Sequence, residues 1–267
     1  MRDAALAGTP RIIVLTGGSG GIGSVIAGHF LKCGDHVVNL DREPFPEDRK
    51  SADGRLTTIP TDLAQVGSVV AAFAEVDRVA GAPPDCLVCC AAMSRSAHVL
   101  DVHSADLDLM LAVNVRGTYL CCQEAGRRMR VHGKGHIVII TSVAAAQAWA
   151  GESVYCLTKA AQASMAQSFA VELAPFGIAV NAVAPGIIDV KSKGMAGTRS
   201  GDVYRHEMER FPSGRFGAPE EIAAAVTYLT SASWITGQTL TVDGGFMATG
   251  LAYLGEARER LLKGGST

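Results

Sequence analysis

The chain has 267 residues, of which 48% are hydrophobic and 19% are charged, and its formal net charge is −2. These values suit one large domain or two small ones, and they exclude the basic surplus typical of nucleic-acid binding. The longest apolar runs, such as residues 11–15, are far too short for a membrane span, and the first residues lack the apolar stretch of a secretory signal. We therefore expect neither a nucleic-acid nor a membrane partner.

Short apolar runs alternate with helical patterns along the whole chain. The predicted strands are rich in branched apolar residues and comprise residues 11–16, 36–41, 56–60, 86–91, 136–142, 178–184 and 238–242. The predicted helices have apolar residues three or four apart or are rich in helix formers, and comprise residues 22–33, 66–80, 106–131, 153–174 and 219–230. Strands that alternate with helices of this length predict a parallel sheet covered on both faces. Without an internal repeat or a linker, we expect a single domain over residues 1–267.

The stretch from Thr16 to Gly23 joins the first predicted strand to the first predicted helix and contains five glycines. Glycines let the backbone turn tightly and approach a ligand closely. The helix start beyond them offers unpaired N–H groups and the positive end of a dipole, which suit a pyrophosphate. Such a turn can also be an ordinary connection, but the order of strand, glycines, helix and strand favours dinucleotide binding. The candidate contacts are Gly17, Ser19, Gly21, Ile22 and Gly23.

Acidic residues end the second and follow the third predicted strand. Asp41 can accept hydrogen bonds from the ribose hydroxyls of NAD and would repel the 2′-phosphate of NADP. Arg42 follows directly and could pair with that phosphate, so the preference is not absolute. Asp62 and Leu63 are placed to reach the adenine, although Asp62 is an equally good N-cap for the next helix.

Tyr155 and Lys159 lie four residues apart in a predicted helix, so the phenol and the ammonium share one face. Tyrosine has a pKa of about 10, and a nearby cation would lower it and permit proton transfer at neutral pH. Alone, such a pair is often a solvated helix face. Ser142 ends the fifth predicted strand, where it can hold a substrate oxygen beside the tyrosine. Asn114 lies inside a predicted helix, which it disfavours, and it could equally be exposed or bonded to a carbonyl.

The seven cysteines include two adjacent pairs within apolar segments, 89–90 and 121–122. Cys86 and Cys89 have the spacing of a redox or metal pair, but residues three apart on a strand point to opposite faces. Buried, reduced thiols in a cytoplasmic protein are the favoured interpretation. His132 and His136 are separated by helix-breaking glycines, so we expect no metal site.

Taken in order, these motifs resemble those of the short-chain dehydrogenase/reductase family over about residues 11–245. The matching positions are Thr16-Gly-x-x-x-Gly21-x-Gly23, Asn114, Ser142, Tyr155-x-x-x-Lys159, Asn181 with Pro185-Gly186, and Asp243-Gly244-Gly245. The resemblance implies an α/β fold with a single Rossmann-type, doubly wound parallel sheet of about seven strands. It also implies a nicotinamide cofactor, which Asp41 predicts to be NAD, together with a small-molecule substrate and a homo-oligomer, either a dimer or a tetramer.

The resemblance further implies roles for single residues in the interconversion of a secondary alcohol and a ketone. Tyr155 would be the acid/base, and Lys159 would lower its pKa and bind the nicotinamide ribose. Ser142 would orient the substrate oxygen, and Asn114 would anchor a water in a proton relay through Lys159. Ile188 would meet the carboxamide through its backbone. The other implied cofactor contacts are Ala91, Pro185 and Gly186.

Two alternatives stay open at this point. The chain could be a reductase that uses NADPH, or a non-catalytic dinucleotide sensor that kept the fold. A sensor has no reason to retain the four implied catalytic residues together, which favours an enzyme. These four are Asn114, Ser142, Tyr155 and Lys159.

Two positions depart from the family's pattern. The family has Asn-Asn-Ala-Gly after the fourth strand, whereas this chain has Cys89-Cys90-Ala91-Ala92. That change removes amide hydrogen bonds that support the strand, and it narrows the space near the cofactor. Val190 stands where the family often has a threonine that touches the carboxamide. We expect the nicotinamide to be held more loosely or differently.

Two segments lie outside the regular pattern. Residues 191–212 form a long polar insertion after the sixth predicted strand, where ligands bind in such sheets, so we expect a lid. Its five basic residues against three acids, with Arg95 on the same rim, favour an anionic substrate, although such charges can simply face water. Residues 246–267 could pack on a neighbouring subunit or be a frayed end. The apolar candidates for the pocket wall are Trp149, Met195 and Tyr204.

Overall fold

The computed structural model describes residues 10–47, 54–190 and 211–249. These residues form one parallel sheet of seven strands in the order β3-β2-β1-β4-β5-β6-β7. The strands are β1 (Ile12–Thr16), β2 (His36–Asp41), β3 (Leu56–Pro60), β4 (Cys86–Cys89), β5 (Gly135–Ile140), β6 (Ile178–Pro185) and β7 (Thr239–Val242). The helices are α1 (Gly21–Lys32), α2 (Val66–Ala80), α3 (Ser104–Met110), the π-helix η3 (Leu111–Gly117), α4 (Thr118–His132), α5 (Ser153–Leu173), α7 (Pro219–Leu229) and the short η4 (Val143–Ala145), η5 (Ala174–Phe176) and η6 (Phe246–Ala248).

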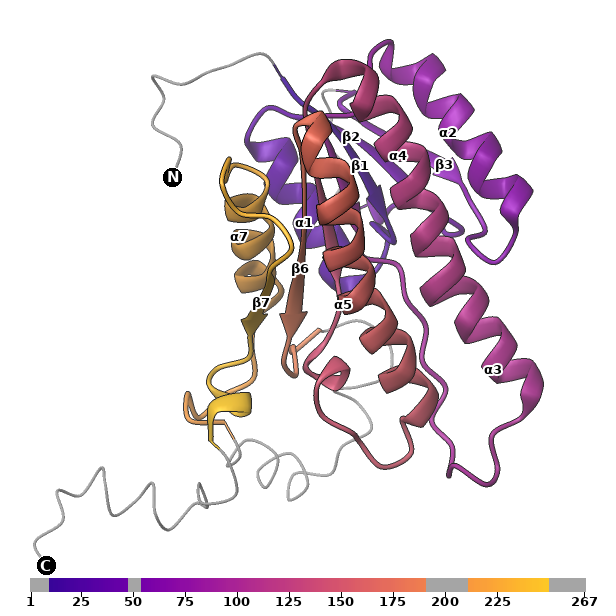
Figure 1. The fold of residues 1–267 in the computed structure, drawn as a ribbon, viewed down its shortest axis with the longest axis vertical. Helices are drawn as coiled ribbons and strands as arrows, with labels where there is room; N and C mark the ends of the chain where they lie inside the picture. Colours follow the sequence, from indigo (N-terminus) through magenta and orange to yellow (C-terminus); the bar gives the residue numbers. More distant parts are fainter. Residues whose placement is uncertain (1–9, 48–53, 191–210, 250–267) are drawn as a thin grey trace, which may run out of the picture.

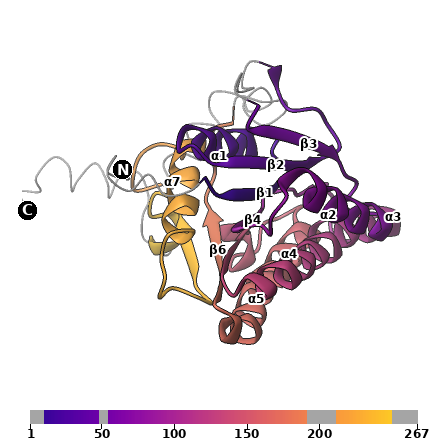
Figure 2. The same cartoon turned by 90° about the horizontal axis from the view of Figure 1, so that it is seen from above.

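Helices cover both faces of the sheet, which confirms the predicted α/β, doubly wound architecture. Helices α1 and α7 pack on one face, and α2, α4 and α5 pack on the other (Figures 1 and 2). Each face has its own buried apolar cluster, with Phe30 of α1 and Ile222 of α7 in one and Phe73 of α2 and Met129 of α4 in the other. The strand order reverses between β1 and β4, and in such sheets a ligand crevice opens at the carboxyl ends of the strands there.

The central strands are apolar on both sides because both sides are covered. Strand β4 shows the consequence for its cysteines. Cys86 belongs to the cluster under α1 and α7, whereas Cys89 belongs to the cluster under α2, α4 and α5. The prediction that these two sulfurs diverge is confirmed. All seven cysteines are free thiols.

The long helix predicted over residues 106–131 is interrupted. It begins at Ser104 as α3, continues as the π-helix η3, and resumes as α4. The interruption coincides with a close approach to the loop after β3, since a Cβ built on Gly117 would lie 2.7 Å from the backbone oxygen of Leu63. A π turn holds an extra residue and shifts the helix phase, which the periodicity of the sequence did not reveal.

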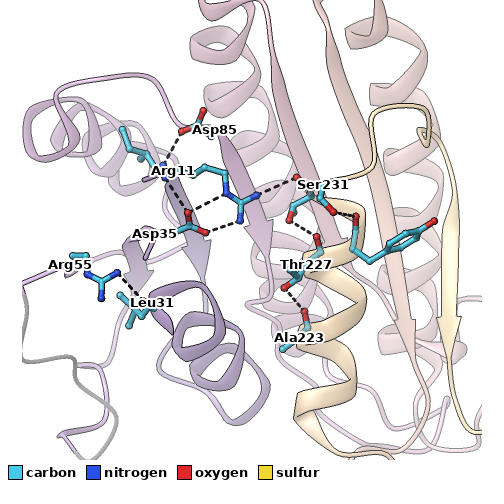
Figure 3. Close-up of polar contacts among 11 residues, drawn as sticks. Arg11, Leu31, Asp35, Arg55, Asp85, Ala223, Thr227 and Ser231 are labelled. Carbon is cyan, nitrogen blue, oxygen red and sulfur yellow. Dashed lines mark hydrogen bonds and ion pairs between the residues drawn. The ribbon is translucent and has the colours of Figure 1, made fainter. Parts of the chain in front are cut away.

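The amino ends of the strands are joined by a polar network around Arg11 (Figure 3). Its guanidinium Nη2 lies 2.7 Å from Oδ2 of the buried Asp35, and its Nη1 donates to the carbonyl of Thr230 at 3.3 Å. Asp85 accepts a hydrogen bond from the backbone N–H of Ile12 at 2.9 Å. Hydrogen bonds and an ion pair within the chain thus connect the amino ends of the strands, and the bond to Thr230 links them to the end of α7, which packs on the same face as α1. None of the helices in the described ranges has the length and apolarity needed to cross a membrane.

Candidate active site

A cleft of about 910 Å³ lies along the carboxyl ends of the strands. The glycine turn after β1 and Asp41 at the end of β2 line one end of it, and Ser142 and Tyr155 line the other. Segments that are far apart in the sequence, from Gly17 to Val190, thus line a single cleft. Almost all of the predicted site residues line this cleft; Asn114 lies just behind it.

The glycine turn leaves the start of α1 open toward the cleft. Gly20 is the N-cap of α1, and no side chain among the described residues caps it. Gly17 has φ of 73°, and a Cβ there would lie 2.6 Å from the backbone of Ala91. A Cβ on Gly23 would overlap the carbonyl oxygen of Gly17. Only glycine fits at these positions, and the uncapped first turn of α1 beyond them suits the pyrophosphate of a dinucleotide.

Asn39 shapes this turn from the neighbouring strand, a role that was not predicted from the sequence. Its Oδ1 accepts a hydrogen bond from the Gly18 N–H at 2.9 Å, and its Nδ2 donates to Ser19 Oγ at 3.1 Å. Asn39 is fully buried in β2. A polar residue in the middle of an otherwise apolar strand was the available signal, because a buried amide needs partners.

Acidic groups stand at the end of the cleft that the glycine turn lines. Asp41 accepts hydrogen bonds from the N–H groups of Ser19 and Glu43, each at 3.0 Å, and it lines the cleft together with Arg42. Asp62 Oδ1 accepts from the Ala64 N–H at 2.9 Å. The N-cap of α2 is Gln65, so the alternative interpretation of Asp62 as this cap is wrong. Asp62 and Leu63 both line the cleft.

Thr16 supports the chain where the family's Asn-Asn pair is replaced. Its Oγ1 accepts hydrogen bonds from the N–H groups of Cys90 and Ala91, each at 3.2 Å. The Cys89 sulfur packs 3.9 Å from that of Cys122. The Thr16 hydroxyl on β1 therefore accepts hydrogen bonds from the chain just after β4, while the Cys89 thiol is buried in the apolar core. Cys90 and Ala91 line the cleft.

The catalytic candidates come from three elements. Ser142 follows β5, and Tyr155 lies in the first turn of α5 within hydrogen-bonding reach of it. Burial raises the pKa of Tyr155 to about 12, and the hydrogen bond from Ser142 lowers this pKa without offsetting the burial. This direction is opposite to the one expected from Lys159, whose Nζ lies 5.5 Å from the centre of the tyrosine ring.

Lys159 is buried, and its ammonium is held by two acceptors. Nζ donates to the carbonyl of Ile140 at 2.9 Å and to Oε1 of Gln162 at 2.8 Å. Burial lowers the pKa of Lys159 to about 8, and the thiols of Cys90 and Cys89 act in the opposite direction. Gln162 is a second residue whose role was not predicted from the sequence.

Asn114 is fully buried, so the interpretation of an exposed residue is wrong. Its Oδ1 accepts from the Met93 N–H at 2.9 Å, and its Nδ2 donates to the Met93 carbonyl at 2.8 Å. Nδ2 also donates to Thr158 Oγ1 at 3.1 Å. The side chain therefore fastens the loop after β4 to α5. The backbone carbonyl of Asn114 accepts from Gln162 Nε2 at 2.8 Å.

Pro185 ends β6 and Gly186 follows it, and both line the cleft with Ile188 and Val190. A Cβ on Gly186 would lie 2.9 Å from Asp243, so a glycine at 186 allows the Pro185-Gly186 segment to pass this close to Asp243. The backbone of Ile188 pairs with that of Gly217.

The end of the cleft beyond Tyr155 carries a carboxylate. Glu152 accepts hydrogen bonds from Ser94 Oγ, at 2.6 Å, and from Ser96 Oγ. Trp149 lines the same end, as predicted, and packs against Phe246 with ring centroids 5.9 Å apart. Val143 and Ile187 pack in one apolar cluster with Trp149, and Met93 and Val190 also line the cleft.

Arg95, which we predicted to bind an anionic substrate, instead forms an ion pair with Asp106. Its Nε lies 3.1 Å from Asp106 Oδ1, and Arg95 is not one of the cleft-lining residues. Residues 191–210 of the predicted lid, with Met195 and Tyr204, lie outside the described residues, as do residues 250–267 of the C-terminal extension. Within the described ranges, no group of three or more His, Cys, Asp or Glu side chains could hold a metal ion.

Comparison with known proteins gives concordant matches over nearly the whole chain. Residues 17–247 match a family model described as enoyl-(acyl carrier protein) reductase. An NAD-dependent glycerol dehydrogenase from Listeria innocua is 34% identical over 89% of this chain and 94% of its own. A short-chain dehydrogenase from Leptospira borgpetersenii with bound NAD⁺ superposes with a TM-score of 0.81, at 29% identity, over 89% of this chain and 93% of its own. ElxO with NADP bound superposes with a TM-score of 0.83, at 28% identity, over 90% of this chain and 100% of its own.

Proposed function

The chain belongs to the short-chain dehydrogenase/reductase family and is an NAD(P)-dependent oxidoreductase, and from this premise we propose that it interconverts a secondary alcohol and a ketone. One observation carries the proposal: Tyr155, bonded to Ser142, stands at one end of a cleft whose other end is the open start of α1. A bound nicotinamide would supply the hydride acceptor or donor. Tyr155 gives its proton to the forming alkoxide during reduction and takes the hydroxyl proton during oxidation.

The other proposed catalytic residues position the groups between which this proton is transferred. Ser142 orients the substrate oxygen against the phenol, and Lys159 holds a positive charge beneath the cleft. Asn114 fixes the Met93 loop that forms the cleft wall, through two backbone hydrogen bonds. A geometry held by buried side chains is what proton transfer over a short distance requires.

NAD(H) is the proposed cofactor. Asp41 places a carboxylate at the adenosine end, where it suits ribose hydroxyls and repels a 2′-phosphate. The alternative, NADP(H), is supported by the exposed Arg42 beside it and by the NADP bound to ElxO. The ratio of kcat/KM for NADH and NADPH decides between them.

For the substrate, the residues around Tyr155 support a small compound that carries hydroxyl groups. Glu152, Ser94 and Ser96 offer oxygens to hydroxyl donors, and a carboxylate at this end opposes anions. The predicted anionic substrate now depends on the lid alone, because Arg95 pairs with Asp106. The glycerol dehydrogenase among the relatives is consistent with a small hydroxylated substrate.

The proposed setting is a homo-oligomer, either a dimer or a tetramer, in the cytoplasm. Free cysteines, several of them buried, suit a reducing compartment. Apolar side chains exposed on α4, α5 and the α7–β7 edge suit contacts with further copies.

The experiment is a panel of diols, hydroxy acids and their ketones, assayed with NAD(H) and NADP(H) at low and high salt. We expect turnover of a neutral hydroxylated compound that is insensitive to salt. A preference for the anionic compounds that weakens with salt would instead assign the lid a role in anion binding. Tight dinucleotide binding without turnover of any compound would favour the sensor.

A further inference from the structure

Gln162 joins two of the catalytic candidates inside the protein. It lies on α5 one turn after Lys159, with a side chain that is almost completely buried. Its Oε1 accepts from Lys159 Nζ, and its Nε2 donates to the backbone carbonyl of Asn114, each at 2.8 Å. Nε2 also donates to Thr118 Oγ1 at 3.1 Å. One amide therefore connects α5 to both the π-helix η3 and the start of α4.

The partners fix the orientation of this amide. An ammonium has donors only, so the atom that faces Lys159 must be the oxygen. The nitrogen then faces a carbonyl and a hydroxyl, which both accept. The flipped amide would place its N–H groups against the ammonium and its oxygen against the carbonyl of Asn114, losing the hydrogen bonds to Lys159 and to Asn114.

We propose that Gln162 is a positioning residue of the active site, whose amide holds the Lys159 ammonium and takes the place of the relay water expected between Lys159 and Asn114. Two of the three ammonium N–H groups then go to Ile140 and Gln162, which leaves the third for the cleft that Lys159 lines. The inference rests on the proposed function of Lys159. An amide holds its protons near neutral pH, so this bridge positions Lys159 without conducting a proton toward Asn114.

The charge state of Lys159 reports on this bridge. The titratable groups that face Lys159 are Tyr155 on its own helix and the thiols of Cys89 and Cys90 at the end of β4. None of them carries a negative charge at neutral pH. The contact with the Cys122 thiol, together with burial, raises the pKa of Cys89, and burial raises the pKa of the other two groups. Neutral acceptors, among them the amide of the bridge, therefore stabilise the ammonium.

The first experiment titrates Lys159 directly, without substrate or cofactor. Protein labelled with ¹³C at lysine Cε is followed by NMR against pH, and the Lys159 signal is assigned by its loss in Lys159→Met. Gln162→Leu removes all three hydrogen bonds at similar volume, so its Lys159 should titrate about one pH unit lower. Gln162→Glu places a carboxylate there, so its Lys159 should titrate higher. Met165→Leu, a buried substitution one turn further along α5, should leave the titration unchanged.

The second experiment measures kcat/KM for ketone reduction against pH for the same variants. The upper limb of the profile, where Lys159 loses its proton, should move down in Gln162→Leu and up in Gln162→Glu, and it should stay in place in Met165→Leu. Melting curves check that all variants are folded. Equal titration of Lys159 in the parent and Gln162→Leu, or shifts of both Gln162 variants in one direction, would overturn the proposal. Opposite shifts in a protein that turns over no alcohol or ketone would uphold the bridge and refute the proposed function.

Discussion

At the scale of single residues, burial acts in opposite directions on the two central groups of the site. It raises the pKa of Tyr155 to about 12 and lowers that of Lys159 to about 8. In both cases burial favours the neutral form of the side chain, because removing a charged group from water costs free energy. At neutral pH the phenol therefore keeps its proton and is ready to act as an acid, the role that carbonyl reduction requires.

Tyr155→Phe should abolish this proton transfer and keep the packing of the ring. We expect kcat to fall at least ~10²-fold, the usual loss for a general acid/base, with NADH binding nearly unchanged. Since the phenolate forms only toward pH 12, alcohol oxidation by the parent should also rise with pH, while ketone reduction should not. Steady-state rates in both directions from pH 6 to about 10 and NADH fluorescence titrations measure these effects. Parent-like turnover by the Phe variant would exclude Tyr155 as the acid/base.

Asp41→Ala should narrow or reverse the preference for NAD(H). The carboxylate would no longer repel a 2′-phosphate, and Arg42 would be able to meet it. We expect the ratio of kcat/KM for NADH over NADPH to fall by about tenfold or more, which corresponds to about 1.4 kcal/mol of lost discrimination. The double variant with Arg42→Ala is the matched control, because it should not gain activity with NADPH. Equal efficiency with both cofactors in the parent would refute the assignment of Asp41.

The residues that the sequence predicted and those that it missed differ in how their contacts arise. Tyr155, Lys159 and Ser142 could be predicted because helix periodicity and strand ends alone bring them to the cleft. Asn39 was missed because its partners lie on other elements, and Gln162 was missed because two of its three partners do, so only the packed fold shows which groups each one meets. The pKa of Tyr155 was predicted in the wrong direction for the same reason, since burial is a property of the folded protein.

At the scale of secondary structure, the interruption of the long helix serves the cleft. The π-helix η3 places the backbone of Asn114 against Gln162 and brings Gly117 onto the loop that carries Leu63. Sequence periodicity does not indicate it, because a single extra residue in a turn leaves the average spacing of apolar residues almost unchanged.

Gly117→Ala tests whether this close approach matters. Helix propensity alone predicts a gain of up to about 1 kcal/mol for alanine. The new Cβ would lie 2.7 Å from the Leu63 oxygen and 2.9 Å from its Cβ, so the backbone must shift, and we expect a net loss of stability. Gly28→Ala in α1 is the control, because nothing lies within 4 Å of the position that its Cβ would take, and it should gain stability. Urea unfolding of both variants measures the difference, and equal gains would show that η3 can move away from Leu63.

At the scale of the whole molecule, the parallel sheet brings residues from Gly17 to Val190 to a single edge. The predicted alternation of strands and helices was sufficient to give this architecture, because parallel strands need helical crossovers. Strand ends were less accurate. Strands β4 and β5 each stop two residues before their predicted ends, since the chain leaves the sheet there to line the cleft.

Two apolar surfaces on the described residues suggest how copies of the chain assemble. One lies on the helices and includes Tyr119 of α4 and Leu157 of α5, and Leu157 is 53% exposed. The other lies at the α7–β7 edge and includes Tyr228, Leu240 and Trp234, and Trp234 is 97% exposed. Two different surfaces that each pair with the same surface of another copy generate a closed tetramer with dihedral symmetry, and this is the assembly that we propose.

Charge substitutions on each surface should therefore divide a tetramer into different dimers. We expect Leu157→Arg and Trp234→Arg each to give dimers, because a desolvated guanidinium without a partner opposes an apolar contact. The double variant should be a monomer. Leu100→Arg, at an exposed apolar residue outside both surfaces, is the control and should keep the parent's mass. Sedimentation velocity measures all four variants, and a parent that is already a dimer would restrict the assembly to the one surface whose variant dissociates it.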